Sequence, residues 1–289
     1  MEKKYSSQIY IWMERFFFGS LLLCLNCCHP LQDQFQKDVN HEFAEQNMEI
    51  KVLTELDLIT LPKPVQRYLR YTKALGKPVA INFRLVFDEL MFKTQQSDPM
   101  VATSEQYNFF ARPSRHFYMR ASMKGIPFRV YHSYTKEKAT MNVKILSLFG
   151  VVDAKGEELT KAETVTFLND LCLFAPSALI YKNISWEEID LKSTRIWFQN
   201  GNFRVSAVLY FNELGELTNF ISEDRYALQD DGSFRNIRWS TPVKEYKEFN
   251  GVKLPTYGEA IWHYPEGDFV YGKFFLKGIA TNLKSSPFQ

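Results

Sequence analysis

The chain has 289 residues, of which 45% are hydrophobic, 16% aromatic and 24% charged. This composition excludes disorder for most of the chain, and the aromatic content favours half-buried strands over a helical bundle. The 35 basic and 33 acidic residues are interspersed and leave a net charge of +2, so the sequence lacks the basic patch of a nucleic-acid-binding protein. The length suits one large β-rich domain with an N-terminal extension.

The first predicted element is an apolar run, FFFGSLLLCL, at residues 16–25. It has the length of the apolar core of a signal peptide and is shorter than the roughly 20 residues that a membrane-spanning helix needs. We therefore expect residues 1–28 to be an export segment, with translation starting at Met1 or at Met13.

Three of the four cysteines and a histidine lie close together in LLLCLNCCHP, residues 21–30. These soft ligands could hold zinc, but no second ligand pair follows at a finger-like or ribbon-like spacing, so no metal site is predicted. A short apolar run followed by a cysteine and a polar segment resembles a bacterial lipoprotein signal, with Leu25 three positions before Cys28. We predict lipid attachment at Cys28, or at Cys27, and a membrane-anchored protein of the cell envelope. A plain secretory signal is the alternative.

Residues 29–49 are rich in Gln, Asn and charged residues and are predicted to form a flexible polar tether. The folded domain is expected to follow over residues 50–289. Its first part, residues 51–75, reads as one or two helices, since Pro62 and Pro64 favour a helix start. Arg67 falls on the polar face of that helix.

From residue 81 onward, apolar and polar residues alternate, which is typical of strands with one buried face. Residues 81–88 (INFRLVFD) and 117–123 (FYMRASM) show the pattern, and Asn-Gly pairs at 200–201 and 250–251 predict hairpins. Roughly ten such strands are consistent with one antiparallel sheet. The predicted fold class is mainly β (α+β), a large curved antiparallel half-barrel with helices packed on its concave face.

One predicted helix, near residues 160–175, interrupts the strands. Thr160 and Glu163 have the spacing of a capping box at its start. The following VTFLNDLCLF is apolar over most of its circumference, so we expect the helix to be buried against the concave face of the sheet. Cys172 is predicted to be a small core residue.

Several segments recur in the order found in a known family. They are LPKPVQRYLRY (61–71), ARPSRHFYMRASM (111–123), LFGVVDAKGEEL (148–159), WEEID, EDRY and EYKEFNGVKLPTYGEAIWHYPEGDFVYGKF. Over about residues 50–280 the chain resembles a bacterial family known as a domain of unknown function, which implies no established activity and no catalytic residues. The order of strands and helix is also similar to the half-barrel of periplasmic lipoprotein carriers (LolA-like), in which helices close a curved sheet over an apolar cavity.

The sequence contains no phosphate-binding glycine loop, zinc-protease motif or serine-hydrolase elbow, so no cofactor and no catalytic residue are predicted. Five charged or titratable residues are candidates for binding a ligand. Glu259 and His263 share a strand face and either line a cavity or are satisfied within the sheet. Asp170, on the apolar helix, either caps a loop or orients a ligand. Arg225 and Arg67 either bind an anionic head group or lie on a solvated face.

These observations favour a non-enzymatic envelope protein whose half-barrel holds a lipid or an acyl chain. One alternative is a hydrolase or isomerase that uses Glu259, His263 or Asp170 as acid and base, which requires these side chains to converge in a pocket. Another is a structural or interaction domain with a solid core. An empty apolar cavity between the sheet and residues 160–175 would separate ligand binding from the solid core.

Overall fold

A computed structural model of the protein describes residues 29–46 and 49–288. The predicted export segment, with Cys27 and Cys28, lies outside the described residues. The helices are α2 (Pro30–Ala44), α3 (Glu55–Leu58), α4 (Lys63–Tyr71), α5 (Glu157–Phe174) and the short 3-10 helix η1 (Pro176–Ile180). The strands are β1 (Asn82–Met91), β2 (Met100–Phe109), β3 (Ser114–Met123), β4 (Ile126–Thr135), β5 (Lys138–Ile145), β6 (Phe149–Lys155), β7 (Ile184–Glu188), β8 (Ser193–Asn200), β9 (Phe203–Phe211), β10 (Leu217–Ser222), β11 (Tyr226–Leu228), β12 (Phe234–Asn236), β13 (Trp239–Ser240), β14 (Val243–Phe249), β15 (Val252–Tyr264) and β16 (Gly267–Thr281).

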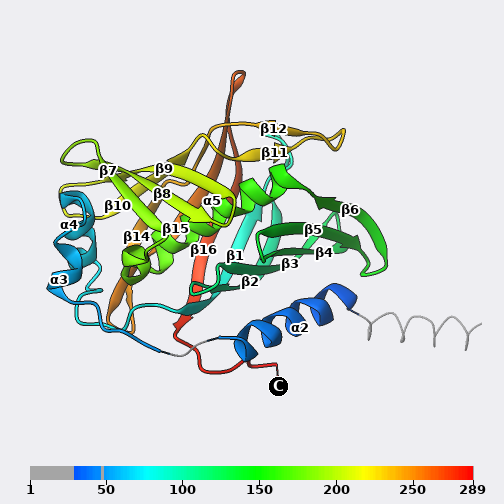
Figure 1. Ribbon diagram of the computed structural model, residues 1–289. Coiled ribbons are helices and arrows are strands. Elements are labelled where there is room, and N and C mark those ends of the chain that lie inside the picture. Colours follow the sequence, from blue (N-terminus) through cyan, green and yellow to red (C-terminus); the bar gives the residue numbers. More distant parts are fainter. Residues whose placement is uncertain (1–28, 47–48, 289) are drawn as a thin grey trace, which may run out of the picture.

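A curved antiparallel sheet of 14 strands forms most of the fold (Figure 1). Its order is β6-β5-β4-β3-β2-β1-β16-β15-β13-β10-β9-β8-β7, and β14 pairs with β15 beside β13. The meander β1–β6 makes one half of the sheet, and β7–β10 with β13–β15 make the other. The last strand, β16, lies between β1 and β15 and joins the two halves. The predicted half-barrel of mainly β class is confirmed.

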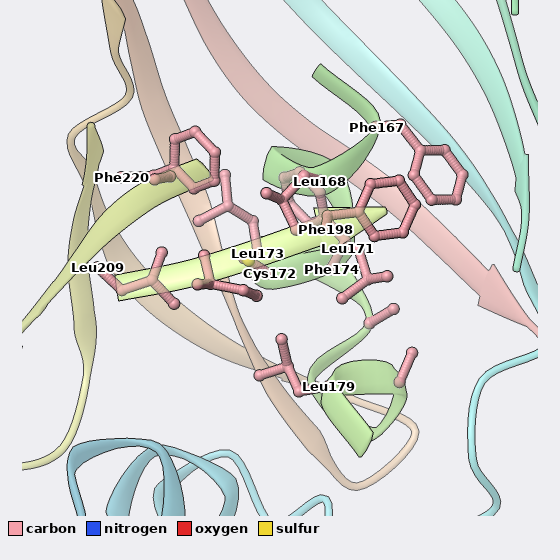
Figure 2. Packing of buried hydrophobic residues seen from close by; sticks show 14 of the residues in the cluster. Phe167, Leu168, Leu171, Cys172, Leu173, Phe174, Leu179, Phe198, Leu209 and Phe220 are labelled. Atoms are coloured by element: carbon pink, nitrogen blue, oxygen red, sulfur yellow. The ribbon is translucent and has the colours of Figure 1, made fainter. Parts of the chain in front are cut away.

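Helix α5 lies across the concave face of the sheet and is buried along nearly its whole length. Figure 2 shows Phe167, Leu168 and Leu171 of α5 among side chains of the facing strands, including Phe198 of β8 and Leu209 of β9. Because this helix contacts strands from both halves of the sheet, it has no polar face for solvent. Cys172 is fully buried and unpaired, as a core residue.

The start of α5 differs from the predicted capping box. The helix begins at Glu157 after Gly156, whose φ of +125° suits a residue without a side chain. Thr160 is already inside the helix, where its hydroxyl donates to the carbonyl of Gly156 at 2.7 Å. Glu163 does not cap the helix, because its carboxylate contacts Arg115 and His132 of the sheet.

The predicted flexible tether over residues 29–49 is wrong, because α2 occupies most of it. Leu31, Phe35, Val39 and Phe43 follow one another every four residues and form one apolar stripe along this helix. The stripe packs on the convex face of β2–β4, on side chains that include Tyr107, Phe109, Tyr118 and Tyr131. These aromatic side chains of β2–β4 supply the apolar surface on which α2 folds. The folded part of the chain therefore begins at residue 30 instead of residue 50.

Helices α3 and α4 form the helical region predicted over residues 51–75. They lie at the end of the sheet opposite α2 (Figure 1), where α4 contacts β8 and η1. Tyr68 of α4 is fully buried, and its hydroxyl donates to the backbone carbonyl of Cys172 at 2.9 Å. This contact fixes the C-terminal end of α5.

Candidate ligand cavity

An unfilled cavity of about 200 Å³ lies between α5 and the concave face of the sheet, and it is partly open to solvent. Most of its wall is apolar, with Phe87, Phe117, Leu173, Phe174, Trp239 and Phe274 among the lining residues. The strands β1, β3, β13 and β16 supply these side chains from one side and α5 from the other. Natural protein cores leave few voids larger than a water molecule. A space of this size at the centre of the half-barrel is therefore the candidate binding site.

Arg115 of β3 is buried in the cavity wall and has a partner for each of its guanidinium nitrogens. Its Nε donates to Asp170 Oδ2 at 2.8 Å, and its Nη1 donates to Glu163 Oε2 at 3.0 Å. Its Nη2 donates to Gln106 Oε1 at 2.9 Å. Gln106 in turn donates to Asp170 Oδ2 at 2.7 Å. Because buried charges need paired and hydrogen-bonded partners, this network fixes α5 on the sheet.

The network sets the charge of its members. Burial works against the charged form of Glu163, but His132 and Arg115 outweigh it and lower the pKa of this carboxyl to about 2. Nδ1 of His132 lies 3.3 Å from Glu163 Oε1. Burial dominates at Asp170 and raises its pKa in spite of Arg115. Asp170, a candidate from the sequence, thus lines the cavity as a partner of Arg115 and not as a loop cap.

Glu89 of β1 is a second buried acid in the cavity wall, and it is 1% exposed. One carboxyl oxygen accepts a hydrogen bond from Ser104, and the other, Oε2, has no partner among the described residues. Burial raises the pKa of Glu89 to about 7, against the opposing effects of Ser104 and Arg115. The group therefore carries a proton over much of the range in which most carboxyls are ionised.

Arg225, between β10 and β11, also lines the cavity. Its guanidinium carbon lies 4.1 Å from the ring centre of Trp239 and 5.2 Å from that of Trp262. Its Nε and Nη1 are buried and have no hydrogen-bond partner in the described part of the chain. The cavity thus contains one arginine that is fully paired, Arg115, and one that is not.

Glu259 belongs to the cavity wall, but its carboxylate is engaged elsewhere. It accepts a hydrogen bond from Tyr257 and lies 4.0 Å from Nζ of Lys273, its cross-strand neighbour on β16. Arg67 is outside the cavity wall, and its guanidinium donates to the carbonyl of Leu191. Arg67 therefore links α4 to the β7–β8 connection.

His263 is also outside the cavity wall and lies between Ser240 and Asp268. Its Nε2 is 2.8 Å from Ser240 Oγ, and its Nδ1 is 2.7 Å from Asp268 Oδ1, an order of contacts found in serine hydrolases. Alternation along β13 and β15 places Ser240 and His263 on the face opposite Trp239. Ser240 is 2% exposed, so a substrate cannot reach its hydroxyl. We interpret the three residues as a cross-strand hydrogen-bond chain.

Of the three acid and base candidates for a hydrolase or isomerase, Asp170 and Glu259 line the cavity and His263 does not. Asp170 contacts Arg115, Glu259 contacts Tyr257, and His263 contacts Asp268, and these contacts share no residue. Within residues 29–46 and 49–288, no group of His, Cys, Asp and Glu has the arrangement of a metal site. No described helix combines the length and apolar character needed to cross a bilayer.

Two solved structures are similar to the chain in fold. One is a putative outer membrane lipoprotein-sorting protein domain from Vibrio parahaemolyticus, with 8% identity and a TM-score of 0.40, covering 76% of this chain and 91% of that one. The other is a LolA superfamily protein from Nitrosomonas europaea, with 9% identity and a TM-score of 0.40, covering 75% of this chain and 93% of that one. The expected similarity to LolA-like proteins is found, and at this level it has no bearing on function.

None of the curated proteins matches the chain in sequence. A family model matches residues 51–274, which include α5 and the strands that line the cavity, except for the end of β16 after residue 274. The order of segments that resembled a domain of unknown function is thereby accounted for. The chain belongs to the family of unknown function DUF6544.

Proposed function

We propose that the protein binds an apolar small molecule, a lipid or an acyl chain, in the cavity between α5 and the sheet. The observation that carries the proposal is the unfilled, mostly apolar space of about 200 Å³. Apolar cavities of about 150 Å³ hold a molecule as large as benzene, so this one accommodates at least part of an acyl chain. Burial of apolar ligand surface contributes about 25 cal/mol per Å², which supplies the driving force.

The methionines in the cavity wall also favour a bound ligand over a solid core. Met91 and Met119 line the cavity beside the aromatic side chains, and methionine adapts its shape to differently shaped apolar molecules. The proposal is tested by extracting the purified protein with organic solvent and identifying bound lipids by mass spectrometry. Absence of any extractable lipid, together with failure of apolar probes such as 1-decanol to bind, would refute it.

Filling the cavity is expected to weaken ligand binding. Thr166 lies on α5, lines the cavity and is 9% exposed. We expect Thr166→Phe to occupy the space and to weaken binding of 1-decanol at least about tenfold, at a stability cost of about 1–3 kcal/mol from overpacking. Isothermal titration measures the binding. Thr103→Phe is the matched control, because this residue lies on the opposite face of β2 from Ser104 and should leave binding unchanged.

We further propose that the protein works in the cell envelope and is attached to a membrane by lipid at Cys28, or at Cys27. The sequence of residues 16–28 supports this proposal. Mass spectrometry of the mature N-terminus is expected to find a chain that begins at a lipidated cysteine. An unmodified chain that begins upstream of Cys24 would contradict it, and an unmodified chain cleaved downstream would indicate a plain secretory signal.

A further inference from the structure

The guanidinium of Arg225 is held at the cavity wall by aromatic rings instead of by an anion. Trp239 and Trp262 are cross-strand neighbours on β13 and β15, and both ring centres lie within 5.2 Å of the guanidinium carbon. Cation–π contacts orient the group but use none of its hydrogen-bond donors. Nε and Nη1 remain buried without a partner among the described residues. Donors in this state are costly in a protein interior, so an acceptor from outside the chain would stabilise them.

The acids near Arg225 are committed to other cations. Its two preceding neighbours, Glu223 and Asp224, pair with Arg238 at 3.4 Å and with Lys161 at 3.0 Å, respectively. On α5, Glu163 is close enough for Arg225 to lower the pKa of its carboxyl, but its hydrogen bonds go to Arg115 and His132. The positive charge of Arg225 therefore has no direct ion-pair partner in the described part of the chain.

We propose that the ligand is an anionic amphiphile, whose carboxylate or phosphate binds the guanidinium of Arg225 and whose apolar part lies along Leu173, Phe174 and Phe274. This inference rests on the proposed binding of an apolar molecule and adds the chemistry of its head group. A charge-assisted contact with a desolvated guanidinium is stronger than a neutral hydrogen bond. The acidic head group therefore determines which amphiphiles bind, and the apolar wall contributes affinity for the tail. The fully paired Arg115 does not compete for the anion.

Four soluble probes separate the contribution of the head group from that of the tail. Titration of lipid-free protein is expected to show decanoate binding at least about tenfold more tightly than 1-decanol, and acetate not binding measurably. Decyl phosphate should bind as tightly as decanoate if Arg225 binds a phosphate and a carboxylate equally well. Weaker binding of decyl phosphate would identify the carboxylate as the preferred acid. Both outcomes support an anionic head group.

Variants assign the preference to Arg225. Arg225→Met keeps an apolar side chain against the two tryptophans, and we expect it to reduce decanoate binding to the level of 1-decanol while 1-decanol binding is unchanged. Arg225→Lys keeps the charge and should retain part of the preference. Arg238→Met is the matched control, because this arginine is exposed and pairs with Glu223 outside the cavity wall.

The possible failures are distinct. Equal binding of decanoate and 1-decanol to the wild-type protein would overturn the acidic head group and leave the proposed function intact. A preference for decanoate that survives in Arg225→Met would overturn the role of Arg225. Binding of neither probe would refute the proposed function itself. Because the wild-type comparison needs no variant, the inference remains testable even if Arg225→Met does not fold.

Discussion

Replacement of Arg115 by methionine is expected to lower the free energy of unfolding by about 3–5 kcal/mol, the cost of leaving buried charges without their partner. The change would strand Asp170 and remove one of the two cations beside Glu163. Methionine fills much of the same volume, so the loss would reflect charge and hydrogen bonding and not a cavity. Urea unfolding followed by circular dichroism measures it.

The control for this prediction is Arg120→Met on the same strand. Arg120 is exposed on the opposite face of β3, and its replacement should change stability by less than about 0.5 kcal/mol. The double variant Arg115→Met with Asp170→Asn should recover part of the loss, because it removes one stranded charge. If Arg115→Met is as stable as the wild-type protein, the network does not hold α5 on the sheet.

Glu89→Gln is expected to stabilise the protein at alkaline pH and to be neutral at acidic pH. The pKa of Glu89 is about 7 in the fold and 4.5 ordinarily, so the unfolded chain releases this proton first as the pH rises. The fold therefore loses stability between about pH 4.5 and 7, by about 3 kcal/mol in total, at about 1.4 kcal/mol per pKa unit. Glutamine can accept the same hydrogen bond from Ser104 and carries no charge, so the variant should lack this loss.

Urea unfolding of both proteins at pH 4 and at pH 8 tests the prediction. The difference should be near zero at pH 4 and about 3 kcal/mol in favour of Glu89→Gln at pH 8. Asp88→Asn is the matched control, since Asp88 precedes Glu89 on β1 and forms an exposed ion pair with Lys277 at 3.0 Å. A variant less stable than wild type at pH 8 would mean that Glu89 is ionised and stabilised in the fold.

Local patterns were sufficient to predict the sheet and the buried helix. Alternation over residues 81–88 placed the right side chains toward the core, and the apolar circumference of residues 165–174 identified a helix covered on all sides. The helix α2 was missed because its stripe has only one apolar residue per turn within a polar segment. Its stability comes from tyrosines on β2–β4 that become neighbours of α2 only once the sheet has formed.

The same alternation is sufficient to predict the strand face of two polar residues of the cavity. Continuing the pattern of β1 by two positions places Glu89 on the face of Phe87, and extending β3 back from Phe117 places Arg115 on the concave face. Their partners could not be predicted in this way. Arg115 and Asp170 are 55 positions apart and come together only when α5 folds back over the sheet. Residue type alone could not predict that Arg115 would be fully paired and that Arg225 would have two nitrogens without a hydrogen-bond partner among the described residues.

The position of β16 has a consequence for how the protein is made. The cavity wall needs β16 between β1 and β15, yet β16 follows all the other described strands in the chain and so leaves a ribosome after them. Its end at Thr281 pairs with Phe83 near the start of β1. Until then the two halves of the sheet have no common edge, and contacts between residues so distant in sequence form slowly. The cavity wall of a growing chain would therefore stay open until β16 has been synthesised, a state that exposes apolar strand edges to chaperones and proteases.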